Sequence, residues 1–256
     1  MDNNLLVLLI VGALVGASSG FLGSFMVLKR MALVGDALSH VALPGMAIAL
    51  TMAIDPMLGA FVALTAAVIG VWYLGEKTRV YSEALVGVFF TASLAIGILV
   101  TPEPELLEAL FGSLDSINIT DAVITVVAAV FIFYVVRRIS KRLLLGVVSE
   151  DLAKSTGVNI AIVNLIYLFL VGLVVALGVK FLGTLLTGAL VIVPAVAAKN
   201  MSRSLKSFQM TASIIGALSA VVGILVAQNF GISSGPVVVL ISVAVFALSH
   251  LFRTRN

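Results

Sequence analysis

Two residues in an otherwise apolar part of the sequence could carry metal chemistry, namely Asp36 and His40. They are four residues apart, so on a helix they share one face. A carboxylate and a neutral imidazole form a half-site for a divalent cation, because the carboxylate supplies charge and the nitrogen favours transition metals over calcium or magnesium. Two ligands hold a metal weakly, which suits a transport path that must release its cargo. A two-fold dimer would bring a second pair to the same axis.

The position of this pair along the chain predicts that it lies inside a membrane. A helix that begins near Met31 would carry His40 about 15 Å inward, which is about half of a ~30 Å hydrocarbon core. Ionisable groups at that depth are costly and typically face water, a cation or a partner. The structural alternative is that Asp36 caps its helix and His40 bonds a carbonyl of a neighbouring helix. Pro44 and Gly45 predict a kink or break just beyond the pair.

The composition of the chain is that of a membrane protein. Of 256 residues, 61% are hydrophobic and 11% are charged, whereas soluble domains contain roughly 25% charged residues. We therefore expect a single transmembrane domain over residues 1–256. The chain has no cysteine, which excludes disulfides, thiolate ligands and cysteine nucleophiles. The first apolar run follows Asp2 rather than a basic residue and continues past Gly20, so it predicts a retained span and not a cleaved signal peptide.

Apolar runs of the length that a bilayer requires predict an all-α polytopic protein with nine transmembrane helices. Eight is the alternative, because only Lys180 and Gly183 interrupt the sixth and seventh runs. A shorter run at 105–112 predicts an external helix at the membrane interface. The nine runs cover about 5–28, 37–54, 57–75, 84–100, 119–136, 160–179, 181–198, 208–228 and 235–252.

The basic residues predict the orientation of these spans, because cytoplasmic loops collect Lys and Arg. With the N-terminus outside and the C-terminus cytoplasmic, fourteen of the fifteen basic residues lie inside and only Lys180 lies outside. The net charge of +3 therefore reflects topology rather than a nucleic-acid footprint, since the cations sit in short scattered loops. No nucleic-acid partner is predicted.

Three further features have both a structural and a functional interpretation. Gly12, Gly16 and Gly20 form a small-residue ridge that predicts close helix packing within the subunit. Thr91 could line a transport path, although such hydroxyls more often bond their own helix. A basic stretch after Pro194 fits a short amphipathic helix on the cytoplasmic face, and an ordinary positive-inside loop fits equally well. This stretch consists of Ala197, Ala198, Lys199, Asn200, Met201, Ser202, Arg203, Ser204, Leu205 and Lys206.

The motif Gly35-Asp36-Ala-Leu-Ser-His40, between Lys29-Arg30-Met31 and Pro44-Gly45, resembles the second-span signature of a known family. This family comprises the permease subunits of bacterial and archaeal ABC importers for zinc, manganese and iron. Most of the chain takes part in the resemblance. Further similar segments, in the same order as in the family, are 151–153 with Gly157, then 179–183, 189–195 and 231–236.

The resemblance implies a homodimer of permeases in the cytoplasmic membrane, with two copies of a cytoplasmic ATPase and an extracytoplasmic metal-binding protein. Asp36 and His40 would lie on the metal path, and residues 197–206 would contain the helix that couples to the ATPase. The chain has no Gly-x-x-x-x-Gly-Lys-Ser/Thr loop, so it is not expected to be an enzyme and ATP hydrolysis is expected on the partner. Zinc or manganese would be the substrate, with no permanently bound cofactor. Thr91 stands where zinc permeases often have histidine, which leaves the metal open.

Two other classes of function compete with this interpretation. An ion-coupled secondary transporter would use Asp36 as a proton or cation carrier, but it would be supported by inverted repeats, which the sequence does not show. An intramembrane hydrolase would need a third ligand or a nucleophile beside Asp36 and His40. Neither zincin spacing nor a Gly-x-Ser-x-Gly elbow occurs in the sequence, so the hydrolase is the weakest of the three.

Overall fold

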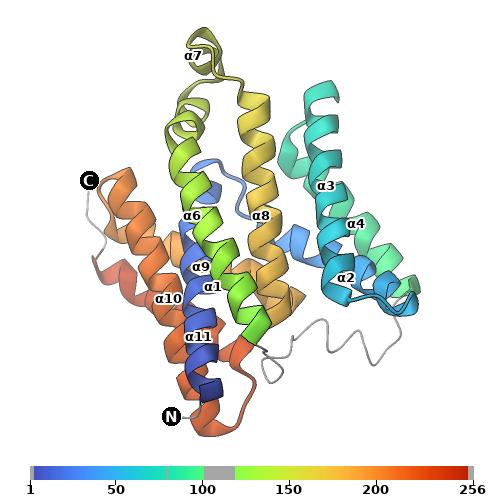
Figure 1. Ribbon diagram of the computed structural model, residues 1–256. Coiled ribbons are helices and arrows are strands. Elements are labelled where there is room, and N and C mark those ends of the chain that lie inside the picture. Colours follow the sequence, from blue (N-terminus) through green and yellow to red (C-terminus); the bar gives the residue numbers. More distant parts are fainter. Residues whose placement is uncertain (1–2, 79, 101–118, 253–256) are drawn as a thin grey trace.

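The structure is a computed structural model that describes residues 3–78, 80–100 and 119–252, and all regular elements in this part are helices. Figure 1 shows a helical bundle in which the first turns of α1 and the short helix α7 lie at opposite ends. The helices are α1 (Asn3–Leu28), α2 (Val34–Thr51), α3 (Pro56–Thr78), α4 (Ser82–Val100), α6 (Ile119–Val148), α7 (Glu150–Ser155), α8 (Ile160–Leu182), α9 (Thr184–Met201), α10 (Leu205–Phe230) and α11 (Ser234–Ser249), followed by a 3-10 turn at His250–Phe252. The predicted all-α fold is confirmed.

Each of the nine predicted apolar runs coincides with a helix. Seven of the described helices are long and apolar enough to cross a membrane, and two shorter apolar helices cover Leu186–Met201 and Ser234–Ser249. The largest difference is in α6, which continues to Val148 instead of ending near residue 136. Its added turns are rich in Arg, Lys and Leu, which are good helix formers, so the apolar run ends before the helix does. The external helix predicted at 105–112 lies outside the described residues.

The boundary between the sixth and seventh predicted spans is a sharp turn at Gly183. This residue has φ +77°, a conformation that a Cβ disfavours and glycine adopts freely. The Thr187 hydroxyl donates a hydrogen bond of 2.6 Å to the Gly183 carbonyl oxygen, which supports the first turn of α9. The chain therefore forms two separate helices here.

Sharp turns also bound α2 at both ends. Arg30 and Ala53 adopt left-handed conformations, with φ 58° and 55°, and each follows a helix that ends in a Schellman motif. The hydrogen bonds that close the two motifs run from Met31 N–H to the Met26 carbonyl and from Ile54 N–H to the Ala49 carbonyl, each 2.9 Å long. These turns fix where α2 begins and ends.

The glycine ridge of α1 packs against α10 within the subunit, as predicted. A Cβ on Gly16 would overlap the carbonyl group of Gly216, and one on Gly20 would overlap that of Ala212. The two backbones therefore approach as closely as small residues allow. This contact holds the N-terminal helix against the C-terminal part of the bundle.

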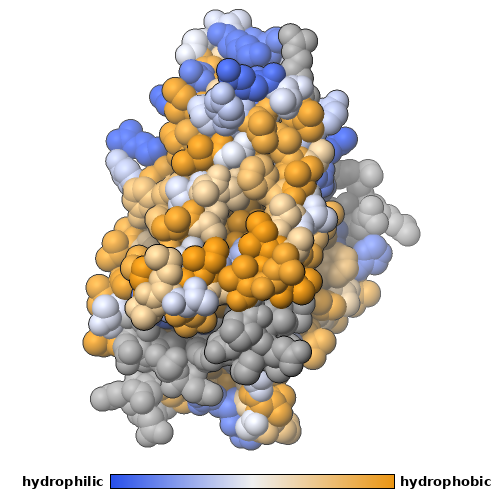
Figure 2. All heavy atoms as spheres, turned by 90° about the vertical axis from the view of Figure 1, so that its right-hand side faces the viewer, coloured by the Kyte–Doolittle hydropathy of each residue, from blue (hydrophilic) through white to orange (hydrophobic). Residues whose placement is uncertain are grey.

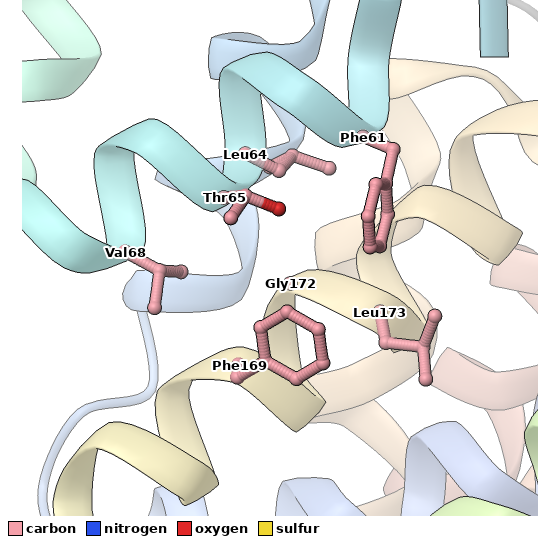
Figure 3. A pocket seen from close by; sticks show the side chains of 7 residues that line it. All are labelled: Phe61, Leu64, Thr65, Val68, Phe169, Gly172 and Leu173. Carbon is pink, nitrogen blue, oxygen red and sulfur yellow. The ribbon is translucent and has the colours of Figure 1, made fainter. Parts of the chain in front are cut away.

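Helix α8 lies at the centre of the bundle and contacts α3 through aromatic and aliphatic side chains. The rings of Phe61 and Phe169 meet edge to face with centroids 6.0 Å apart. Trp72 donates a 2.9 Å hydrogen bond from its indole nitrogen to the Ala161 carbonyl, which attaches the other end of α3 to α8. Figure 3 shows the part of the α3–α8 contact around the two phenylalanines, with Phe61, Leu64, Thr65 and Val68 on α3 and Phe169, Gly172 and Leu173 on α8.

The outer surface of the bundle is largely apolar. Figure 2 shows hydrophobic side chains over much of the face that carries α3 and α4, with hydrophilic residues gathered at the upper end. Leu58, Val62 and Val88 are more than half exposed on this side, at 58%, 66% and 62%. Exposing an apolar surface of this extent to water would be unfavourable, so the surface faces lipid or another apolar protein surface.

Candidate functional site

Asp36 and His40 both lie on α2, with Asp36 in its first turn and His40 one turn later. The predicted shared face is therefore confirmed. The helix begins at Val34 and not near Met31, which shortens the helical distance to His40. The start of α2 is nevertheless inside the protein, because Met31, Val34 and Gly35 are buried.

Neither side chain is used by the fold in the way that the structural alternative requires. The N-cap position of α2 is occupied by Leu33, which provides no side-chain cap, and the Asp36 carboxylate forms no hydrogen bond with any described residue. Nδ1 of His40 is buried and has no hydrogen-bond partner in the described part of the chain. An unpaired buried nitrogen costs about 1–3 kcal/mol. The imidazole therefore keeps a lone pair or proton available for something other than the fold.

Helix α9 passes directly beside Asp36 at Gly188. A Cβ placed on Gly188 would lie 2.6 Å from Cα of Asp36 and 2.7 Å from its Oδ1. The Ser39 hydroxyl lies 2.7 Å from the Thr184 carbonyl oxygen and 2.6 Å from the Asp36 carbonyl oxygen. These contacts position the first two turns of α2 on the start of α9. Sequence reasoning missed Gly188 and Ser39 as positioning residues, although Ser39 lies inside the Asp36–His40 motif.

Phe90 lies beside the imidazole of His40, and Pro44 follows His40 one turn later in α2. The Phe90 ring meets the imidazole edge to face at a centroid distance of 5.3 Å. Pro44 has no N–H group, so the His40 carbonyl cannot receive its usual helical hydrogen bond. Of the predicted kink or break at Pro44, the break does not occur, because α2 continues to Thr51. His40 thus combines an unpaired ring nitrogen with a backbone oxygen that is free of its helical donor.

Thr91 belongs to α4 but does not contact the pair. Its hydroxyl donates within its own helix, with the Gly87 carbonyl at 2.8 Å and the Val88 carbonyl at 3.1 Å, and the side chain is exposed. The neighbouring residue Phe90, which sequence reasoning did not single out, is the one that α4 presents to His40. No three His, Asp or Glu residues cluster in the described part of the chain. A metal at Asp36 and His40 would need further ligands from water, backbone oxygens or a second copy.

The stretch 197–206 does not form a separate short helix, so of the two interpretations given above its local structure is that of a connection between α9 and α10, and its role in coupling to an ATPase stays a prediction. Its first half is the end of α9, which stops at Met201, and Leu205 already begins α10. The reason is local: Ser204 accepts a hydrogen bond from the Ser207 amide at 3.2 Å and so caps α10 as soon as α9 ends. Three basic side chains of the stretch remain exposed, those of Lys199, Arg203 and Lys206.

A polar cavity of about 380 Å³ lies where the connections after α1, α3 and α6 meet. Lys29, just beyond α1, donates a 2.5 Å hydrogen bond to Oδ1 of Asn164, and its ammonium lies 5.3 Å from the Tyr167 ring centroid. Burial lowers the pKa of Lys29 to about 8, and the nearby Glu150 opposes this shift. The lysine fixes the end of α1 to α8 at this face.

Residues 1–253 match the ABC 3 transport family. The "Manganese transport system membrane protein MntC" of Listeria innocua is 31% identical, over 97% of this chain and 90% of its own length. The "High-affinity zinc uptake system membrane protein ZnuB" of Haemophilus influenzae is 30% identical, over 96% and 97%.

Solved structures have the same fold. "PsaBC from Streptococcus pneumoniae in complex with Fab" superposes with a TM-score of 0.85 at 30% identity, over 97% of this chain and 91% of the other. "An inward-facing conformation of a putative metal-chelate type ABC transporter" has a TM-score of 0.76 at 19% identity, over 95% and 84%, which indicates a shared fold alone.

Proposed function

The chain belongs to the ABC 3 transport family, and from this premise we propose that it carries manganese or zinc across the membrane past Asp36 and His40. It is a multi-span permease subunit of an ABC transporter in the cell membrane. The observation that supports the metal path is the unpaired His40 Nδ1, one helical turn from an unpaired carboxylate on a buried helix. The ion-coupled alternative is set aside, since the relatives are ABC permeases.

Each group at the site has a distinct role in this proposal. Asp36 supplies the negative charge that attracts a divalent cation into the bundle, and the imidazole of His40 supplies selectivity for transition metals. The His40 carbonyl oxygen, freed by Pro44, is a further ligand of the kind that manganese accepts. Two side-chain ligands from one chain bind weakly, so cargo is released, and a second permease copy would complete the coordination.

The remaining partners follow from the family and from the charges at the ends of the helices. We place the N-terminus outside, so that fourteen of the fifteen basic residues are cytoplasmic. Two copies of a cytoplasmic ATPase would dock against residues 197–206, where Lys199, Arg203 and Lys206 are exposed. An extracytoplasmic protein would deliver the metal. ATP hydrolysis belongs to the ATPase, and the metal is cargo and not a resident cofactor.

Metal uptake by proteoliposomes that contain the permease and its ATPase tests the proposal. Asp36→Asn and His40→Ala should each abolish uptake of Mn²⁺ or Zn²⁺, while complex yield and basal ATP hydrolysis stay near the unmodified level. Thr51→Val is the matched control on the same helix, because the Thr51 hydroxyl only bonds the Ile48 carbonyl of its own helix, at 2.8 Å. Normal uptake by an assembled Asp36→Asn, His40→Ala double variant would remove the pair from the mechanism.

A further inference from the structure

A groove of about 370 Å³ lies on the outer side of the bundle, between α3, α6 and α8. It adjoins the contact in Figure 3, with which it shares Thr65, Val68 and Phe169. Its wall is apolar apart from the hydroxyl of Thr65. Ile69 on α3 and Phe131 on α6 are 52% and 47% exposed at its edge, so the groove is accessible from the surroundings of the bundle.

The α6 wall of this groove continues toward the end of the helix with two arginines, Arg138 and Arg142. On α6 the residues Phe131, Val135, Arg138 and Arg142 follow at spacings that keep them on one side of the helix, and the first two line the groove. Both arginines are exposed. The Arg138 guanidinium lies 5.7 Å from the Tyr134 ring centroid, and its Nε donates to the Tyr134 hydroxyl at 3.4 Å. Arg142 forms no ion pair with any described residue.

We propose that this groove binds one acyl chain of an anionic phospholipid, whose phosphate is held by Arg138 and Arg142. From Phe131 to Arg142 the helix rises about 16 Å, which is close to half of a ~30 Å hydrocarbon core. A chain that fills the groove therefore brings its headgroup to the arginines. Guanidinium groups bind phosphate oxygens in a bidentate manner, and basic pockets between spans on the cytoplasmic side are typical sites for anionic headgroups.

The charges around the upper end of the groove favour an anion. Arg138 and Arg142 lie on the groove side of α6, whereas Arg137 and Lys141 point to other sides of the same helix. On α3 the acid that continues the groove side is Glu76, and α7, which follows α6, carries Glu150, Asp151 and Lys154, so the excess of arginine is confined to the groove side of α6. On α8 the exposed neighbour is Ile162, which is apolar. The proposal needs only that these helices span a membrane with their basic ends inside, and it is independent of the metal path.

The chain contains its own reporter for this site. Trp72 is the single tryptophan, and although it does not line the groove itself, it lies one turn of α3 beyond the lining residues Val68 and Ile69. Its indole is fixed by the 2.9 Å hydrogen bond to the Ala161 carbonyl. Lipids with bromine on the acyl chain quench a tryptophan that they contact, so Trp72 fluorescence reports which lipid occupies the groove.

The experiment uses the full chain in phosphatidylcholine vesicles that contain brominated phosphatidylglycerol or, in a parallel series, brominated phosphatidylcholine. The unmodified chain should be quenched at a lower mole fraction of the anionic lipid than of the zwitterionic one. Arg138→Gln and Arg142→Gln should each reduce this preference about fivefold, as expected for about 1 kcal/mol per basic residue. The matched control is Arg137→Gln with Lys141→Gln, which removes two charges from the same helix and should keep the preference.

Three outcomes would overturn the proposal. Equal quenching by the two lipids in the unmodified chain would show that no headgroup is selected. An equal loss of preference in the control variant would assign the effect to the general surface potential. No quenching by either lipid would mean that protein, such as a second copy of the chain, covers the groove. Val135→Phe, which narrows the groove and leaves all charges in place, should lower quenching by both lipids.

Discussion

Gly188 on α9 lies so close to Asp36 on α2 that a Cβ at this glycine would be 2.7 Å from Oδ1 of the carboxylate. Because Gly188 has no side chain, α9 leaves room for the carboxylate of Asp36. The adjacent contact of Ser39 with the Thr184 carbonyl, at 2.7 Å, fixes the same two helices to each other. The proposed metal path thus depends on how α9 packs as well as on the residues of α2.

Gly188→Ala is expected to lower metal uptake strongly while the complex still assembles. The added methyl group would lie 2.6 Å from the backbone Cα of Asp36, so α2 and α9 must separate, and overpacking of this kind typically costs about 1–3 kcal/mol. Uptake assays and thermal unfolding of the purified chain measure the two effects separately. Gly87→Ala on α4 is the control, because a Cβ there meets no atom within 4 Å. If Gly188→Ala transports normally, the close contact has no bearing on the site.

Thr91→Val is expected to leave uptake unchanged and to alter stability by less than about 0.5 kcal/mol, the usual range for exposed substitutions. Its hydroxyl bonds only its own helix, to Gly87 and Val88. Phe90→Ala, one residue away, removes the ring beside His40 and should reduce uptake. Transport assays on the two variants in parallel decide which residue of α4 contributes to the site. A defect in Thr91→Val alone would reverse the assignment.

Ala53→Gly is expected to stabilise the protein, because the left-handed conformation of Ala53, with φ 55°, costs about 1–2 kcal/mol with a Cβ and little without one. Part of this gain is offset by the greater freedom of glycine in the unfolded chain. Gly231→Ala is the reciprocal change, at φ 64° with no atom near the added Cβ, and it should destabilise. Thermal unfolding in detergent measures both. Shifts of the same sign would contradict this account of the turns.

The helices of this protein could be predicted from the sequence because membrane spans need long apolar runs, and run length is a local property. The turn at Gly183 was predicted only in part, because Lys180 and Gly183 alone interrupt the sixth and seventh runs and eight spans therefore stayed an alternative. The end of α6 was not predicted, because arginine and lysine end an apolar run but are good helix formers and do not end the helix. Ser204 likewise starts α10 within a stretch for which a short amphipathic helix and an ordinary loop fitted the sequence equally well.

The pair at the proposed site was found because ionisable residues are rare in spans and Asp36 and His40 are one turn apart. Their surroundings could not be predicted in the same way. Gly188 of α9 reaches Asp36 and Phe90 of α4 reaches His40, and such contacts depend on how helices cross, which hydropathy does not encode. The unpaired state of His40 Nδ1 is also a property of the packed structure alone.

Stability is expected to depend on pH through Lys29. Burial lowers its folded pKa to about 8, whereas an unfolded lysine titrates near ~10.4. Between these values the unfolded chain binds the extra proton, so this group contributes stability that increases as pH rises through that window. Lys29→Met should remove the increase. Unfolding midpoints of both proteins between about pH 7.5 and 10.5 give the difference, and identical pH profiles would show that Lys29 is not desolvated.

Arg203 and Lys206 are exposed basic residues that follow α9. If the ATPase docks at residues 197–206, Arg203→Glu with Lys206→Glu should reduce recovery of the ATPase with the purified permease. The permease should still insert, since both side chains are exposed and neither is the Ser204 cap of α10. Lys77→Glu, an exposed change at the end of α3, controls for loss of cytoplasmic charge in general.

Co-purification in detergent at two salt concentrations separates the mechanisms of such a loss. A docking contact made through these charges weakens in the unmodified complex as salt rises, because exposed charges are screened over a Debye length of about 8–10 Å at 0.10–0.15 M ionic strength. The charge-reversed variant should then show low recovery at both concentrations. Full ATPase recovery with the doubly reversed variant would make this stretch an ordinary positive-inside connection. Equal losses with Lys77→Glu would place the docking surface elsewhere on the cytoplasmic face.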